Sequence, residues 1–67
     1  MNLFSDVRIK ENIVSEGTTW KGHNVYHFNY IGDDVQRRGV MAQEVERTRP
    51  DAVTEINGIK LVNYEIL

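Results

Sequence analysis

The clearest pattern of apolar and polar positions in the chain is an alternation over Val25–Ile31. Tyr26, Phe28 and Tyr30 fall on one face of the strand that this pattern predicts, and the side chains between them fall on the other face. Gly32-Asp33-Asp34 follows and predicts the turn that ends the strand. We expect the aromatic face to pack in the core. An exposed aromatic platform for a sugar or a neighbouring subunit is the alternative.

The second half of the chain predicts a short helix followed by a hairpin. The composition of Ala42–Arg49 favours a helix, and Pro50 ends it because the residue before a proline avoids the α region. Ala52–Ile56 and Ile59–Val62 flank Asn57-Gly58, the strongest short signal for a hairpin, since both central residues of a type I′ turn need a positive φ. The helix spans about two turns, so it needs packing against the rest of the chain to persist.

The beginning of the chain allows two interpretations. Within Ser5–Val14, the alternation over Val7-Arg8-Ile9-Lys10 predicts a strand or an extended arm. Ser5 or Asp6 could equally cap a short helical turn, so both interpretations stay open.

The following segment, Ser15–Asn24, predicts a loop, because Gly17 and Gly22 stand among polar residues. Trp20 lies inside this segment. A tryptophan in a loop usually covers a core or contacts a partner, so one interpretation of Trp20 is an intersubunit or ligand contact.

The length of 67 residues allows one domain, residues 1–67, with a limited core. A domain of about 60 residues buries only about 60% of the surface that its unfolded chain exposes, so small domains usually add disulfides, a metal or a partner chain. The chain has no Cys, which excludes disulfides and thiolate zinc. His23 and His27 could bind a metal with Asp33 or Asp34, but we expect a polar strand face here, with no metal and no cofactor.

The charge balance narrows the class of partner. Eight Lys and Arg residues stand against ten Asp and Glu residues, and the formal net charge is -2. Nucleic-acid binding needs a surplus of basic residues on one face, so we expect no nucleic-acid partner. No apolar run approaches the roughly 20 residues of a membrane helix, and the start of the chain does not have the features of a signal peptide. We therefore expect no membrane partner and synthesis in the cytoplasm.

Three blocks of the sequence together carry a resemblance to one family. Ser5–Ile13 fits the pattern S-D-x-R-x-K-x-N/D-I, and Gly39–Val45 fits G-x-I/V/M-A-Q-E/D-V with Pro50 following. Asn57-Gly58 forms a turn before the third block, V-x-Y-x-x-L, which is Val62–Leu67. In this order the blocks resemble the C-terminal intramolecular chaperone of endosialidase and of phage tail-spike or tail-fibre proteins, also called the S74 peptidase domain.

The resemblance implies a domain that assembles homotrimeric phage fibres or spikes and then cleaves itself from them. Cleavage in the family uses the serine of the first block and the lysine five residues on. These are Ser5 and Lys10 here, and the bond cut is Phe4–Ser5. A protein of this kind is made in the host cytoplasm and acts in the virion, at the phage tail. Its partners are copies of itself and a tail-fibre or tail-spike protein.

Without the family resemblance, the residues do not decide whether Ser5 and Lys10 form a catalytic pair. A serine is a weak nucleophile until a base takes its proton, and a lysine is such a base only where burial or nearby cations lower its pKa. Ser5 and Lys10 do not share a face of a strand or a regular helix, so they would meet only across a bend or between subunits. In the alternative interpretation, Ser5 caps or ends a turn and Lys10 is solvated.

Fold and function are therefore expected as follows. The fold is a small α+β domain of short antiparallel hairpins with one short helix, assembled as a homotrimer. The first function is trimerisation, assembly and tip capping of a phage tail fibre or spike. A self-cleaving serine peptidase is the alternative, and a fibre tip that attaches to a host glycan is the second alternative. The residues expected at the intersubunit contacts are Arg8, Trp20, Ile66 and Leu67.

Overall fold

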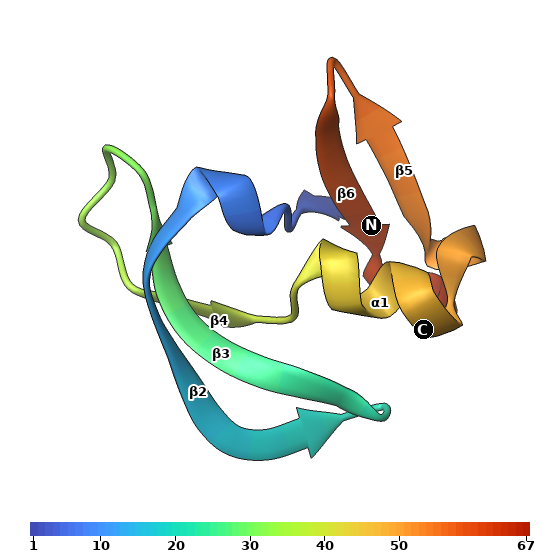
Figure 1. Cartoon of the computed structure of the whole chain (residues 1–67), viewed down its shortest axis with the longest axis horizontal. Coiled ribbons are helices and arrows are strands. Elements are labelled where there is room, and N and C mark those ends of the chain that lie inside the picture. Colours follow the sequence, from blue (N-terminus) through green and yellow to red (C-terminus); the bar gives the residue numbers. More distant parts are fainter.

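The computed structural model describes all 67 residues and contains two three-stranded antiparallel sheets and one α-helix (Figure 1). The first sheet has the strand order β1-β6-β5, and the second has the order β2-β3-β4. The expected α+β fold of short antiparallel hairpins with one helix is confirmed, and the homotrimer stays a prediction. The strands are β1 (Asn2–Phe4), β2 (Lys10–Trp20), β3 (His23–Tyr30), β4 (Arg37–Gly39), β5 (Val53–Ile56) and β6 (Ile59–Asn63).

The helix α1 (Ala42–Thr48) comes shortly after β4 and lies between the two sheets (Figure 1). It packs against β5 and β6. The buried side chains around it are small and aliphatic, so the core is limited, as the length of the chain predicts. The core cluster consists of Val40, Ala42, Val45, Ala52 and Val62.

The helices of the structure are too short to span a membrane.

The predictions for the second half of the chain are confirmed to within one or two residues. The helix ends at Thr48, and Pro50 begins a short 3-10 helix instead of continuing it. Strands β5 and β6 form a hairpin around Asn57 and Gly58, whose φ angles are 51° and 81°. These left-handed values are the ones that the Asn-Gly signal predicts.

The predicted strand over Val25–Ile31 is confirmed as β3, which begins two residues earlier and ends one residue earlier. Phe28 is buried, as expected for a core position, whereas Tyr26 and Tyr30 are half-buried. On the other face, the His27 Nε2 atom lies 3.0 Å from a carboxylate oxygen of Glu16. The aromatic face of this strand is therefore partly core and partly accessible.

The loop predicted over Ser15–Asn24 is wrong. Strand β2 runs through this segment as far as Trp20 and pairs with β3. Gly17, with a φ of 83°, lies where the strand register is irregular, between Ser15 and Thr19. Gly22, with a φ of 82°, lies in the tight turn between the strands. The two glycines therefore mark a bulge and a hairpin turn, which glycine's access to positive φ permits within a continuous hairpin.

At the beginning of the chain, the capped helical turn is confirmed, and the strand predicted from the alternation over Val7–Lys10 is wrong, because a strand begins only at Lys10. The Asp6 side chain caps a 3-10 helix, Val7–Ile9, and β2 starts at Lys10 directly after it. Ahead of this turn, β1 pairs with β6 in the other sheet. The segment around Ser5 and Asp6 therefore connects the two sheets.

Candidate active site

Ser5 lies at the junction of the two sheets and is 2% exposed. Its backbone N–H donates to the Lys60 carbonyl over 3.1 Å, and its carbonyl accepts from the Ala42 N–H over 2.8 Å. One side of Ser5 is thus bound to strand β6 and the other to the start of α1. These two bonds hold the residue that the family resemblance marks as the nucleophile.

Asp6 is completely buried and accepts five hydrogen bonds. Three come from Arg8, through its backbone N–H and two guanidinium nitrogens. The others come from the Gln43 side chain and the Lys60 N–H. Although burial opposes it, the Arg8 guanidinium and the other donors hold the pKa of Asp6 well below its ordinary range. Asp6 is therefore a fixed anion that joins the turn, the helix and β6.

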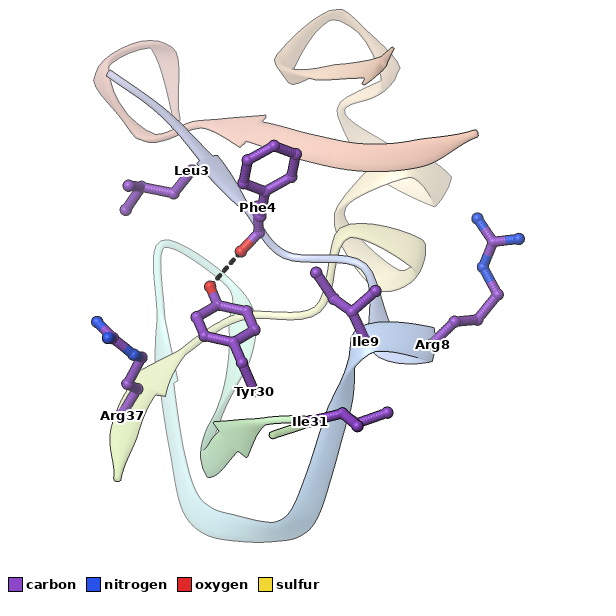
Figure 2. Close-up of a pocket in the computed structure, with 7 residues that line it drawn as sticks. All are labelled: Leu3, Phe4, Arg8, Ile9, Tyr30, Ile31 and Arg37. Carbon is purple, nitrogen blue, oxygen red and sulfur yellow. Dashed lines mark hydrogen bonds between the residues drawn. The ribbon is translucent and has the colours of Figure 1, made fainter. Parts of the chain in front are cut away.

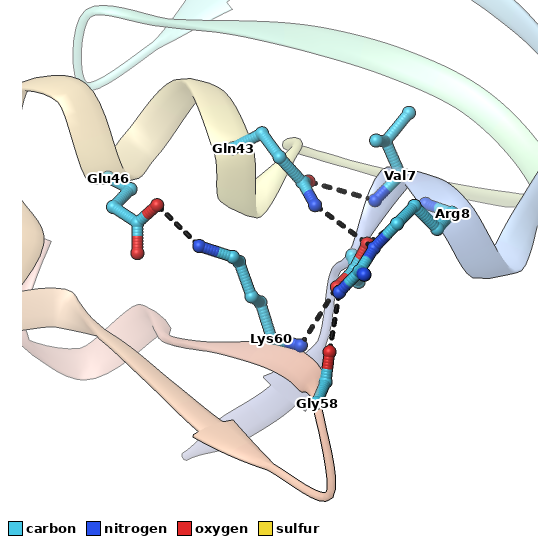
Figure 3. Close-up of polar contacts among 7 residues, drawn as sticks. Val7, Arg8, Gln43, Glu46, Gly58 and Lys60 are labelled. Carbon is cyan, nitrogen blue, oxygen red and sulfur yellow. Dashed lines mark hydrogen bonds and ion pairs between the residues drawn. The ribbon is translucent and has the colours of Figure 1, made fainter.

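Residues around Asp6 also join the turn that follows Ser5 to the helix and to the β5–β6 hairpin (Figure 3). Arg8 also donates to the Gly58 carbonyl at the hairpin turn, over 2.5 Å. Gln43, at the start of α1, accepts from the Val7 N–H over 2.9 Å. Figure 3 shows the Lys60 side chain turned toward Glu46, with which it forms an ion pair. The turn that follows Ser5 is thus bound to two other elements.

Lys10 is 5% exposed, and no carboxylate pairs with it. Its Nζ donates to the Val40 carbonyl over 2.8 Å, lies 3.7 Å from the Met41 sulfur and sits 4.0 Å from the centre of the Phe28 ring. Burial lowers the pKa of Lys10 to about 8, and the charge of Asp6 opposes this shift. The alternative of a solvated Lys10 is therefore wrong, and burial supplies the condition under which a lysine acts as a base.

The bend that could bring Ser5 and Lys10 together is present as the 3-10 helix Val7–Ile9. Both residues contact the stretch that leads into α1: the Lys10 amine donates to the Val40 carbonyl, and the Ser5 carbonyl accepts from the N–H of Ala42, the first residue of the helix. No hydrogen bond joins the Ser5 hydroxyl to the Lys10 amine. The structure therefore brings the two residues to one segment without direct contact between their reactive groups.

The carbonyl oxygen of Phe4 accepts a hydrogen bond from the Tyr30 hydroxyl over 2.5 Å (Figure 2). Tyr30 and Ser5 also line one cavity of about 150 Å³. Burial raises the pKa of Tyr30, with the charge of Arg37 opposing, so the phenol stays protonated at neutral pH. Sequence reasoning placed Tyr30 only on an aromatic face. No local pattern relates it to Phe4, since the two are 26 residues apart and lie in different sheets.

A larger apolar groove of about 660 Å³ opens beside Phe4 (Figure 2). Figure 2 shows aliphatic and aromatic side chains around it, with an arginine at either side. Leu3 and Phe4 are 44% and 47% exposed, so the groove leaves large apolar side chains open to solvent. Its lining residues are Leu3, Phe4, Arg8, Ile9, Tyr30, Ile31 and Arg37.

The residues expected at intersubunit contacts occupy four different environments. Arg8 binds Asp6 within the chain. Trp20 stacks on Tyr64 with ring centres 5.7 Å apart and keeps 37% of its surface exposed. Ile66 is 43% exposed, whereas Leu67 packs against the core cluster. Ile66 and Trp20 therefore keep the surface that a contact with another subunit requires.

The comparison with known families matches the first part of the chain to one family. The family model described as chaperone of endosialidase, Peptidase_S74, matches residues 5–54. This range contains Ser5, Asp6, Lys10, Tyr30 and Gln43. No curated protein and no solved structure matches the chain. Because the matched range covers more than half of the sequence, the chain belongs to the chaperone-of-endosialidase family, which supports a chaperone or S74-like role at family level.

Proposed function

We propose that this chain is an assembly domain of a phage tail fibre or tail spike, which associates as a homotrimer and caps or assembles the fibre. The observation that carries the proposal is the family match over residues 5–54. The family is described as a chaperone of endosialidase. The role that we propose on this basis is the binding of chains to one another, and not the turnover of a small molecule.

The distribution of apolar surface supports association with other chains. Large apolar side chains are exposed on several elements, while the buried core contains mainly small residues. Burying exposed apolar surface contributes roughly 25 cal/mol per Å², so contacts between copies would add the stabilisation that a short chain cannot obtain alone. The most exposed of these side chains are Met1, Val14, Ile31, Val35 and Ile56, and Phe4, Leu3 and Ile66 follow.

Native mass spectrometry of the whole chain at micromolar concentration tests the assembly. We expect a species of three copies. Ile66→Asp, which places a charge on an exposed position of a proposed contact, should shift the population toward single copies. Thr54→Asp is the control, because Thr54 is an exposed polar residue and belongs to no proposed contact. A wild-type chain that stays monomeric under these conditions contradicts the proposal.

Self-cleavage of the Phe4–Ser5 bond is a second candidate function, and the environment of Lys10 favours it. Lys10 is buried without a counter-ion, its pKa is lowered to about 8, and it contacts the segment that also binds Ser5. The Ser5 hydroxyl and the Lys10 amine make no direct hydrogen bond, but catalytic hydrogen bonds often tighten only during the reaction.

The proposed cleavage proceeds in two steps. Neutral Lys10 takes the proton of the Ser5 hydroxyl, and the oxygen attacks the carbonyl carbon of Phe4. The carbonyl oxygen becomes an oxyanion, and it returns to a carbonyl as the carbon–nitrogen bond breaks. The leaving nitrogen receives the proton from Lys10 and becomes the amino group of Ser5. Water then hydrolyses the ester between Phe4 and Ser5, which gives a carboxylate at Phe4 and restores the hydroxyl.

Mass spectrometry under denaturing conditions, over a time course, tests this second function. We expect a product that begins at Ser5, and its loss in Ser5→Ala and in Lys10→Met. A wild-type chain that stays intact contradicts self-cleavage. Loss of the product in Ser5→Ala but not in Lys10→Met would remove Lys10 from the proposed pair.

A further inference from the structure

The peptide bond between Phe4 and Ser5 is held from both sides. The Tyr30 hydroxyl donates to the Phe4 carbonyl oxygen over 2.5 Å, and the Ser5 N–H donates to the Lys60 carbonyl over 3.1 Å. Figure 2 shows the Tyr30 hydroxyl directed at this carbonyl from the other sheet. The oxygen that would carry negative charge during cleavage therefore already has one fixed donor.

The sheet places Tyr30 beside Lys10. The two residues are direct partners in the pairing of β2 with β3, so their side chains lie on the same face of the sheet. Phe28, two residues before Tyr30, projects from that face too, and the Lys10 amine lies 4.0 Å from the centre of its ring. One face of this sheet thus presents an amine and a phenol, with the phenol on the Phe4 carbonyl.

The tyrosine ring is also fixed in its orientation. It packs edge-on against the Phe28 ring, with centres 5.4 Å apart and planes at 76°. The Arg37 guanidinium lies 5.4 Å from the centre of the Tyr30 ring. A donor held in place by such contacts needs little reorganisation when charge develops on its acceptor.

We propose that Tyr30 is a catalytic residue of the self-cleavage, whose hydroxyl stabilises the oxyanion that forms on the Phe4 carbonyl oxygen when Ser5 attacks. This inference rests on the self-cleavage proposed above. In the step, the carbon–oxygen bond to Ser5 forms, the carbonyl electron pair moves to the Phe4 oxygen, and the Tyr30 O–H bond points at that charge. Tyr30 keeps its proton, and the oxyanion loses its charge when the carbon–nitrogen bond breaks.

The protonation states fit this division of roles. Burial lowers the pKa of Lys10 to about 8 and raises the pKa of Tyr30. Above about pH 8, Lys10 is therefore mostly neutral and able to accept a proton, while Tyr30 is still a donor.

The test compares the rate of cleavage in the wild-type chain with that in Tyr30→Phe, measured by the appearance of the product that begins at Ser5. Removing one oxyanion donor commonly lowers a rate by roughly 10²–10³-fold, and we expect a loss of this order. Tyr26→Phe is the matched control. It removes a hydroxyl from the same strand that binds Glu44 and not the scissile peptide, and it should leave the rate unchanged.

A second variant keeps the fold nearly unperturbed. Replacing Tyr30 by 3-fluorotyrosine retains the hydroxyl and makes it a stronger donor, so the cleavage should be at least as fast as in the wild-type chain. Equal rates for wild type and a folded Tyr30→Phe would overturn the role of Tyr30 while leaving the self-cleavage standing. An intact wild-type chain would contradict the self-cleavage itself, and the role of Tyr30 with it.

Discussion

Two charged side chains, Asp6 and Lys10, are buried at opposite ends of the same short 3-10 helix, and their surroundings differ. Asp6 accepts five hydrogen bonds, and its pKa is held well below its ordinary range. Lys10 has one carbonyl, a sulfur and an aromatic ring, and burial lowers its pKa to about 8. The fold thus stabilises the charge of one residue and penalises the charge of the other.

The difference separates a structural group from a reactive one. A buried carboxylate with several donors is strongly held, because each donor stabilises its charged form. A buried ammonium without an anion releases its proton easily, which is the property of a general base. We infer that Asp6 connects the two sheets around Ser5, whereas Lys10 is available for proton transfer.

The largest effect should come from Asp6→Asn. The variant leaves the Arg8, Gln43 and Lys60 donors facing an amide, and we expect a loss of about 2–3 kcal/mol of unfolding free energy at pH 7. Urea denaturation measures it. A loss below about 0.5 kcal/mol, the range of ordinary surface substitutions, would contradict the central position of Asp6.

The difference in unfolding free energy between the wild-type chain and Asp6→Asn should depend on pH. The pKa of Asp6 in the folded chain lies below its ordinary 3.8, so its contribution is complete at neutral pH and is lost as the pH falls below about 4. The stability difference between wild type and Asp6→Asn should therefore shrink at acidic pH. A difference that stays constant down to pH 2 would contradict this assignment.

Lys10→Met should change the free energy of unfolding by a smaller amount than Asp6→Asn, and in the opposite direction. Removing a penalised charge should stabilise the chain by about 1–2 kcal/mol at pH 7, because the penalty exceeds the one hydrogen bond lost. The pKa of Lys10 is lower in the folded chain than the ordinary 10.5, so the unfolded chain binds more protons between pH 8 and 10. Wild-type stability should therefore rise relative to Lys10→Met over this range. An advantage of Lys10→Met that does not change between pH 7 and 10 would count against the shifted pKa.

The smallest effect should come from Asp51→Asn, which is a matched control for Asp6. Asp51 also pairs with an arginine two residues away, Arg49, but its side chain is 61% exposed. Exposed ion pairs contribute little to stability, so denaturation curves of the variant and the wild type should overlap. A loss as large as that of Asp6→Asn would mean that the pair itself, and not its burial, determines the effect.

The sequence predicted the elements whose signals are local. Asn57-Gly58 and Pro50 act through their own backbone preferences, and the hairpin and the helix end follow from them. The first block of the family pattern identified Ser5 and Lys10 before their positions were known. Burial of Lys10 and its contact with the Val40 carbonyl depend on the whole fold, so no local pattern could predict its lowered pKa.

The sequence did not predict the continuous hairpin around Gly17 and Gly22 or the contact of Tyr30 with Phe4, and each has a physical reason. Gly17 and Gly22 indicate a loop by composition, but at the observed positions they permit a bulge and a tight turn within one hairpin. The contact of Tyr30 with the Phe4 carbonyl joins two separate sheets, so it arises from tertiary packing alone.

The most direct test of the role proposed for Lys10 is an NMR titration of its side chain in the whole chain, followed through the Cε and Nζ signals. We expect a midpoint near pH 8, which would mark Lys10 as a buried amine able to accept the Ser5 proton. A midpoint near the ordinary 10.5 would show that Lys10 is an ordinary solvated ammonium. It would contradict the statement that the fold destabilises the charge of Lys10, and with it the proposed cleavage.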